Sequence, residues 1–146
     1  MKALQTFEPA LAQAIIDITE DGNALEVEGA LDEALASYEK AWHLLPIPKT
    51  GWTMLSAWVT SCFYGVYFTK QDFKAALEWG LLELESRDSV VDVGPWMDLG
   101  KVYFELGEQD IAFSYFQKAF EIGKSRVFKE EPKHYYKFFT ARYARR

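Results

Sequence analysis

Apolar residues recur along this chain three and four positions apart, in segments that are separated by glycine, proline and charged turns. This spacing is typical of amphipathic helices. It predicts an all-α protein with seven helices, near residues 9–28, 31–45, 52–69, 71–86, 94–107, 109–123 and 132–143. The first six helices form three pairs joined by short turns, and short turns favour antiparallel neighbours.

The helix pairs carry similar residues at recurring places, which indicates an internal repeat. Ala34, Ala76 and Ala112 anchor the second helix of each pair, so the repeat steps are 42 and 36 residues long. Both steps exceed a repeat unit of about 34 residues. The additional residues fall in the turn-rich stretches PIPKTG and RDSVVDVGP. Such connections lengthen at little free-energy cost because they run over the surface.

The repeat is clearest in residues 94–120. There the spacings W-x2-L-G-x2-Y and A-x3-F are carried by Trp96, Leu99, Gly100, Tyr103, Ala112 and Phe116. With these residues the sequence resembles the tetratricopeptide repeat family over roughly residues 15–123. The resemblance implies a short superhelix of stacked antiparallel helix pairs in a single domain, 1–146. Repeats are expected at about 15–46, 57–88 and 93–123, and the tail 124–146 is expected to hold a C-terminal capping helix.

The other two repeats match the family less well. In the first, Gly22 fits, whereas Ile18 stands in place of the usual tryptophan. In the second, Tyr64 replaces a small residue, and Gly80 and Glu83 replace an aromatic residue and an alanine. The motifs at residues 44–52 and 128–136 make the layout similar to small bacterial three-repeat proteins. That type implies a non-catalytic protein-binding scaffold, with members that serve as partners or immunity proteins for toxins.

Charge is unevenly spread along the chain. Residues 1–50 hold three Lys and Arg against nine Asp and Glu, and residues 51–123 hold five against eleven. Residues 124–146 reverse this, with eight against two. The acidic body argues against nucleic acid as a partner, because phosphate neutralisation needs a broad basic face. The basic tail has two interpretations: a solvated helix beside the acidic body, or a docking element for an acidic partner.

No sequence pattern favours catalysis, a metal site or a cofactor. Cys62, His43 and His134 lack the local spacing of zinc ligands, and no glycine-rich phosphate loop is present. We interpret Cys62 as a small, half-buried apolar residue and predict that the protein is not an enzyme. Apolar runs are too short for a membrane span, and no leader-like apolar stretch opens the sequence, so we expect a cytoplasmic protein.

A partner is expected on the first helix of each pair, since these helices line the concave side of a stacked array. The candidate protein-binding residues are Thr19, Asn23, Glu26, Trp58, Ser61, Phe68, Met97, Lys101, Phe104 and Glu105. The alternative for Phe68, Met97 and Phe104 is that they extend the core. Family members that hold a chaperone's C-terminal carboxylate use Lys, Asn and Arg at set positions, of which only Asn23 is matched here. The sequence therefore favours a basic or apolar protein segment over a carboxylate.

These observations predict a non-catalytic protein–protein interaction module. Our first hypothesis is a cognate, immunity-type inhibitor of a toxin or effector, because an acidic surface suits a basic target. The alternative is a chaperone-like or structural adaptor in a larger assembly, and an accessory subunit of an enzyme is a third possibility. We expect a protein or peptide partner, and neither nucleic acid nor a membrane. The sequence leaves the oligomeric state open.

Overall fold

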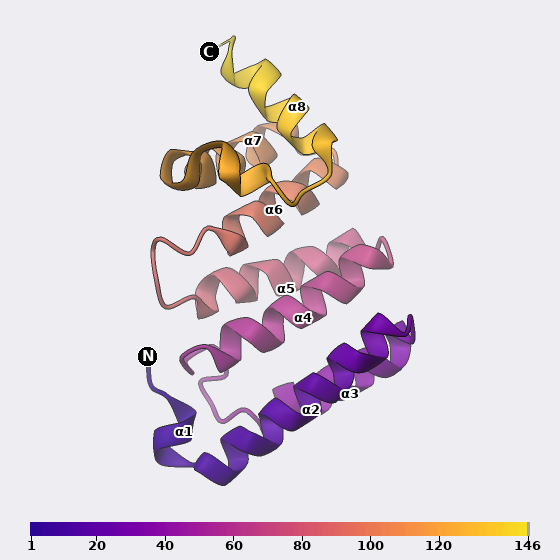
Figure 1. Ribbon diagram of the computed structural model, residues 1–146, viewed down its shortest axis with the longest axis vertical. Coiled ribbons are helices and arrows are strands. Elements are labelled where there is room, and N and C mark those ends of the chain that lie inside the picture. The colour runs from indigo at the N-terminus through magenta and orange to yellow at the C-terminus, as the bar shows by residue number, and fades with distance from the viewer. Residues whose placement is uncertain (146) are drawn as a thin grey trace. The chain divides into compact units, whose positions relative to one another are not determined.

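The computed structural model describes residues 1–145, which form two compact units (Figure 1). The first unit, Met1–Asp88, holds α1 (Leu4–Phe7), α2 (Pro9–Val27), α3 (Leu31–Leu44), α4 (Leu55–Thr69) and α5 (Phe73–Ser86). The second unit, from Ser89 onward, holds α6 (Gly94–Glu105), α7 (Gln109–Gly123), the 3₁₀-helix η1 (Lys124–Phe128) and α8 (Lys133–Tyr143). Helix α2 packs with α3, α4 with α5, and α6 with α7.

All seven predicted helices are present, which confirms the all-α fold. The helix predicted from residue 52 begins at Leu55, because the preceding residues pair with the N-terminus instead: Thr53 N–H donates to the Lys2 carbonyl at 2.8 Å. The last helix begins at Lys133, with Pro132 as its N-cap. The short elements α1 and η1 were not predicted. The single domain over 1–146 stays a prediction.

The three helix pairs close through turns of one length and geometry. The turns are residues 28–30, 70–72 and 106–108. In each, a residue with positive φ follows the first helix, and the next N–H donates to the carbonyl five residues back at 2.9 Å. The positive-φ residues are Gly29, Gln71 and Gly107, and the donor–acceptor pairs are Ala30–Leu25, Asp72–Tyr67 and Glu108–Tyr103. This is a Schellman helix ending, used three times at the spacing of the anchoring alanines.

Two of the pairs bring a glycine against an aromatic ring. A Cβ on Gly22 would lie 2.5 Å from Cε1 of Tyr38, and a Cβ on Gly100 would lie 2.5 Å from Cδ1 of Phe116. Both separations are far inside van der Waals contact in a close-packed interior. Only glycine therefore lets the two helices approach this closely.

In the second pair, the small and the large residue exchange helices. Tyr64 stands at the first-helix position and is 4% exposed, whereas Gly80, sixteen residues later, stands at the second-helix position and is buried. Sixteen residues also separate each glycine from its ring in the other two pairs. The second repeat thus keeps one small and one large residue, although it departs from the family's pattern.

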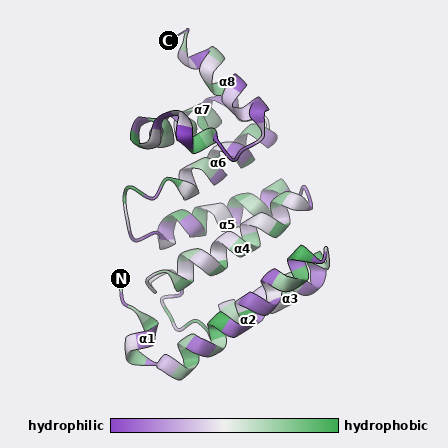
Figure 2. Cartoon of the chain, viewed as in Figure 1, coloured by the Kyte–Doolittle hydropathy of each residue, from purple (hydrophilic) through white to green (hydrophobic). Residues whose placement is uncertain are grey.

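The core of the first unit combines buried aliphatic side chains with a group of aromatic rings. Phe63 of α4 stacks on Trp79 of α5, with ring centroids 3.8 Å apart, and Trp42 of α3 meets Trp79 edge-on at 5.1 Å. Helix α4 has no charged residue, and Figure 2 shows it in pale to green tones. A helix that is apolar on all sides needs most of its surface covered. The part of α4 that neighbouring helices leave exposed is therefore a candidate surface for a partner.

A lysine stabilises the junction between α3 and α4. The ammonium of Lys49 donates to three carbonyl oxygens at the end of α3, those of Trp42 (2.8 Å), His43 (3.2 Å) and Leu45 (2.8 Å). The Trp42 carbonyl also accepts from the Leu45 N–H at 3.2 Å. Carbonyls at the end of a helix lack the usual partner four residues on, and a cation there also suits the helix dipole. Trp52 donates from Nε1 to the Pro46 carbonyl at 2.9 Å, and Ser56 donates to the Lys49 carbonyl at 2.6 Å.

In the second unit, the tail packs on α6 and α7 through aromatic rings. Phe139 of α8 is fully buried. Its ring centroid lies 5.0 to 5.4 Å from those of Phe113, Phe120, Phe128 and Tyr143. Two ion pairs hold the tail, Glu131 to Lys101 at 2.6 Å and Arg142 to Asp110. The C-terminal helix caps the last helix pair, as predicted.

Candidate functional site

The predicted binding residues of the first unit differ in exposure. Those that are half-buried, and so reach the surface, are Asn23, Glu26, Trp58, Ser61 and Phe68. Thr19 is fully buried, and its hydroxyl donates to the Ile15 carbonyl at 2.7 Å. The structure therefore places Thr19 within the helix packing and not on a surface that a partner could reach.

An apolar pocket of about 470 Å³ lies beside Trp58. Its lining residues are Gln5, Ile16, Glu20, Met54, Leu55 and Trp58, which come from α1, α2 and the start of α4. Glu20 is exposed, and Met54 is 73% exposed. A pocket of this size and lining is large enough for a large apolar side chain, and the Glu20 carboxylate is one of its lining groups. We call it the Trp58 pocket.

Beyond the pocket, a polar cluster joins α2 to α4. The hydroxyl of Tyr38 lies 2.7 Å from Oδ1 of Asn23 and 2.8 Å from Oε1 of Glu26. The Cys62 thiol donates to the same Asn23 oxygen at 3.4 Å, across 39 residues of sequence. These contacts hold the Asn23 oxygen, whereas its amide nitrogen has no partner within residues 1–145 and can donate to another molecule.

Burial keeps the two hydrogen-bond donors of this cluster protonated. Burial, and then the charge of Glu26, raises the pKa of the Cys62 thiol to about 12. Burial, and then the hydrogen bond to Glu26, raises the pKa of Tyr38 above its usual value. The thiolate is the nucleophilic form of cysteine, so at neutral pH Cys62 acts as a hydrogen-bond donor.

The pocket and the cluster form one surface between α2 and α4. We call it the α2–α4 strip and define it as Glu20, Asn23, Glu26, Trp58, Ser61 and Cys62. The Ser61 hydroxyl donates to the Trp58 carbonyl at 2.7 Å. The strip offers an apolar hollow, an amide donor and two carboxylates.

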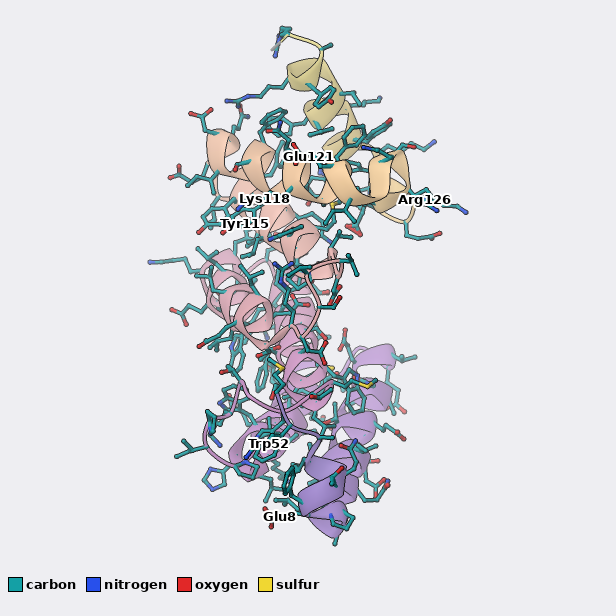
Figure 3. The ribbon with its side chains drawn as sticks, turned by 90° about the vertical axis from the view of Figure 1, so that its left-hand side faces the viewer. Glu8, Trp52, Tyr115, Lys118, Glu121 and Arg126 are labelled. Atoms are coloured by element: carbon teal, nitrogen blue, oxygen red, sulfur yellow. The ribbon has the colours of Figure 1, made fainter. Side chains whose placement is uncertain are left out.

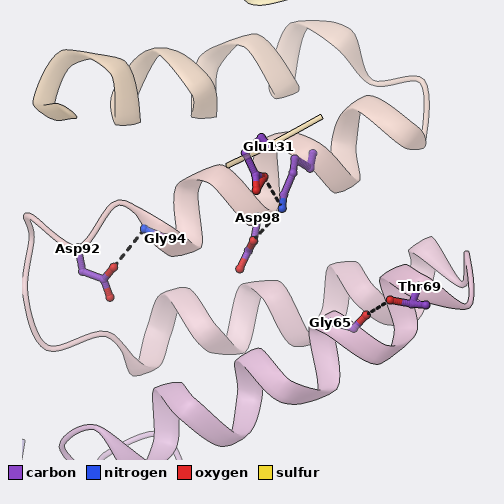
Figure 4. A network of polar contacts seen from close by, with 7 residues as sticks. Gly65, Thr69, Asp92, Gly94, Asp98 and Glu131 are labelled. Carbon is purple, nitrogen blue, oxygen red and sulfur yellow. Dashed lines mark hydrogen bonds and ion pairs between the residues drawn. The ribbon is translucent and has the colours of Figure 1, made fainter. Parts of the chain in front are cut away.

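At the end of α4 the side chains pack on their own helix pair. Phe68 stacks on Tyr64 with centroids 5.5 Å apart and meets Phe73 of α5 edge-on at 5.2 Å. The Thr69 hydroxyl donates to the Gly65 carbonyl at 2.9 Å (Figure 4). Phe68 therefore packs α4 against α5, which favours its alternative role in the core.

The predicted residues of the second unit are held mainly by its own tail. The Lys101 ammonium lies 2.6 Å from Glu131 Oε2 and 3.5 Å from Asp98 Oδ1 (Figure 4). The Phe104 ring centroid lies 5.0 to 5.7 Å from those of His134, Tyr135 and Phe138. Met97 is buried, and Glu105 is exposed. Within this unit, Lys101 and Phe104 serve to fasten the capping helix.

The sequence pattern did not mark most of the pocket lining. Ile16 lies one helical turn before Glu20, so extending the α2 stripe backwards by one turn would have found it. Met54 is the N-cap of α4 and Leu55 is its first residue, where no periodicity identifies them. Gln5 belongs to α1, which is too short for a periodic signal.

A second apolar cavity, of about 510 Å³, lies at the N-terminal end of the first unit. It is lined by Met1, Lys2, Ile47, Pro48, Gly51 and Trp52. Figure 3 labels Trp52 on the segment that precedes α4, and its ring meets that of Phe7 edge-on at 6.5 Å. None of the predicted binding residues lines this cavity, and none of its lining residues belongs to the α2–α4 strip.

Within residues 1–145, no three His, Cys, Asp or Glu side chains are grouped so that they could hold a metal ion. His43 belongs to the first unit and His134 to the second. In the same part of the chain, no helix combines the length and the apolar character that crossing a bilayer requires.

Residues 93–123 match the tetratricopeptide repeat family. The matched segment contains α6, the turn 106–108 and α7, which is the pair in which Gly100 faces Phe116. A comparison with curated proteins finds no match. Tetratricopeptide repeats are typically non-catalytic modules of protein–protein interaction. The match assigns a tetratricopeptide repeat to the α6–α7 pair, and the other helices of residues 1–145 include two further packed pairs, α2 with α3 and α4 with α5.

Proposed function

We propose that this chain binds a segment of another protein along the α2–α4 strip, with one large apolar side chain of that segment in the Trp58 pocket. The observation that carries the proposal is the pocket itself, an apolar hollow that includes the carboxylate of Glu20. Hollows of this kind on an otherwise polar surface are typical sites for another molecule. Asn23 and Glu26 follow Glu20 along α2 and supply polar contacts to the same segment.

The charge of the first unit supports a basic partner. Residues 1–88 hold six Lys and Arg against fourteen Asp and Glu. A field of this sign speeds the approach of a cationic molecule and disfavours an acidic one. The bound segment therefore combines an aromatic or large aliphatic side chain with neighbouring lysine or arginine.

Within this class, the role we propose is inhibition of a basic toxin or effector. Occupying a basic surface of such a protein blocks the surface that would otherwise meet its acidic target. The chain itself carries out no catalytic step in this proposal, and Cys62, with a pKa of about 12, supports that assignment. A bacterial host and the cytoplasm remain predictions.

The binding step is tested with a displayed library of random peptides selected on the purified protein. Selected peptides are expected to pair an apolar residue with Lys or Arg, and calorimetry gives their Kd. Trp58→Ala should raise Kd at least about tenfold, because it removes the wall of the pocket. The control is Lys118→Ala: Lys118 is exposed on α7, with its ammonium 5.2 Å from the Tyr115 ring centroid (Figure 3). Equal Kd values for wild type and Trp58→Ala would exclude the pocket as the site.

The inhibitory role needs a separate test in cells. Basic reading frames found beside the gene for this chain are each expressed with wild type, with Trp58→Ala or with Lys118→Ala, and growth is measured. We expect rescue by wild type and Lys118→Ala and loss of rescue with Trp58→Ala. Growth arrest in all three strains would contradict inhibition even if the peptides bind.

A further inference from the structure

The outer face of α8 is cationic. The helix buries Tyr135 and Phe139 against the second unit, whereas Lys133, Tyr136 and Lys137 are exposed. Among residues 1–145, neither lysine takes part in an ion pair. Two lysines four positions apart on a helix repel each other and weaken it. The stability of α8 therefore does not explain why they are there.

The neighbouring turn extends this face. The ring centroids of Phe128 and Tyr136 lie 5.0 Å apart, which brings the end of η1 beside the first turn of α8. Arg126 and Lys129 are exposed in and after η1. We call Arg126, Lys129, Lys133, Tyr136 and Lys137 the cationic face of the tail. Tyr136, 36% exposed, is its aromatic member.

The α2–α4 strip has the complementary chemistry. The strip contains the carboxylates of Glu20 and Glu26, and Asp17 and Asp21, exposed on α2 beside the strip, have the same four-residue spacing as Lys133 and Lys137. Between the two aspartates lies Glu20, which lines the Trp58 pocket, and between the two lysines lies Tyr136. An aromatic side chain close to two cations thus has a counterpart in an apolar pocket that is lined by one carboxylate, Glu20, with two more carboxylates exposed on the same helix.

We propose that the cationic face of the tail in one copy of this chain docks on the α2–α4 strip of a second copy, with Tyr136 directed toward the Trp58 pocket. The proposal rests on the proposed function, because it uses the same strip and makes a second copy a competitor for it. The two surfaces are different, so the contact is head-to-tail and can extend beyond two copies.

An anionic membrane would also attract lysines, but the observations favour a second copy. Membrane-bound helices insert an apolar face, and the apolar residues Tyr135 and Phe139 of α8 are already buried in the second unit. The strip, in contrast, offers both the carboxylates and the apolar hollow on one surface.

The test is sedimentation velocity of the full chain from roughly 10 µM to 1 mM, the range of weak contacts. At about 0.1 M salt, where the Debye length is about 10 Å, repulsion between the net charges is screened, whereas adjacent opposite charges still attract. We expect the average sedimentation coefficient to rise with concentration and to rise less at about 0.5 M salt. A chain that stays monomeric throughout overturns the proposal.

Charge reversal locates the contact. Lys133→Glu/Lys137→Glu should weaken self-association at least tenfold, and so should Asp17→Lys/Asp21→Lys. The control for the α8 reversal, Lys74→Glu/Lys118→Glu, makes the same change in net charge as that reversal at two exposed lysines of α5 and α7 and should keep the association. Association that the α8 reversal leaves unchanged overturns the proposal and directs attention to the apolar cavity beside Trp52.

Mixing the two reversed variants gives the sharpest outcome. Each variant alone has charges of the same sign at positions 133 and 137 and at positions 17 and 21. In the mixture, these positions of one variant meet opposite charges on the other, so association should return. A mixture that stays monomeric contradicts the pairing. If wild type is monomeric and still binds selected peptides through Trp58, this inference alone fails. If it self-associates through the strip and no peptide binds, the proposed binding of a foreign segment alone fails.

Discussion

The ring of Phe116 on α7 fills the space that a side chain on Gly100 of α6 would need, since a Cβ there would come within 2.5 Å of the ring. Both residues lie in the segment that matches the tetratricopeptide repeat. The same relationship joins Gly22 to Tyr38 in the first pair. The contact between a bare backbone and a ring therefore sets the distance between paired helices.

Gly100→Ala should lower the free energy of unfolding by about 1–3 kcal/mol, because Phe116 is fully buried and cannot move aside without cost. Urea denaturation measures the change. Gly65→Ala is the matched control in α4: a Cβ there meets only Glu26 Oε2, at 3.8 Å. Helix propensity should make that variant more stable by about 0.5–1 kcal/mol. Changes of the same sign at both sites would rule out the steric explanation.

Gln71→Gly should stabilise the protein. Gln71 has a φ of 61° in a turn where the other two pairs have glycine, and this conformation costs a side-chain-bearing residue about 1 kcal/mol. We expect an increase in unfolding free energy of up to about that amount, measured by urea denaturation. The reverse change, Gly107→Gln, should lower stability by a similar amount. A loss of stability in Gln71→Gly would mean that the glutamine side chain contributes more than the backbone conformation costs.

Lys49→Met should destabilise the first unit by about 1–3 kcal/mol, because three carbonyl oxygens at the end of α3 lose a charged donor. Methionine keeps most of the side-chain length, so the loss reports the ammonium group. The control is Lys40→Met, at an exposed position of α3, where a change within about 0.5 kcal/mol is expected. Equal melting temperatures for both variants would show that the ammonium does not stabilise the junction.

Stability should fall at alkaline pH. The folded protein raises the pKa of Cys62 to about 12 and raises that of Tyr38, whereas in an unfolded chain a thiol and a phenol titrate near about 8.5 and 10. The contribution is thus fully present below about pH 8.5 and is lost as pH rises toward 12. Burial also raises the pKa values of Tyr67, Tyr103 and Tyr135 in the same direction.

Comparison with Cys62→Ala isolates the share of the thiol. Urea denaturation between about pH 7 and 11 should show a shallower alkaline decline in the variant than in wild type. Iodoacetamide should also label Cys62 slowly in the folded protein at about pH 8 and rapidly in urea. Identical pH profiles for the two proteins would contradict the raised thiol pKa.

Much of the fold was predictable because its signals are local. Helical periodicity located seven helices, and the spacing of Ala34, Ala76 and Ala112 matches that of the three turns. The start of α4 was not predictable, because it depends on the N-terminus: Lys2 accepts a hydrogen bond from Thr53 and thereby keeps that segment out of the helix. A contact between residues about fifty positions apart leaves no local pattern in the sequence.

The candidate site was predictable only in part. Asn23, Glu26 and Trp58 lie on the surface that the first-helix stripe indicated. Phe104 and Lys101 lie on the corresponding stripe of α6, but Phe138 of the tail contacts Phe104, and Glu131 of the tail pairs with Lys101. An aromatic residue that anchors a partner and one that anchors a capping helix have the same sequence signature, so only the fold separates them.

The reversed sizes of Tyr64 and Gly80 make the middle repeat incompatible with exchange. If α4 paired with α3 or α7, the ring of Tyr64 would compete with that of Tyr38 or Phe116 for one space. If α2 or α6 paired with α5, two glycines would face each other across a void. Three similar hairpins in one chain are otherwise prone to swapping helices during folding. The exchanged positions of the large and the small residue therefore favour pairing of α4 with α5 over the other helices. A chain whose three repeats were made identical would lose this selectivity and would be more prone to mispairing of its helices.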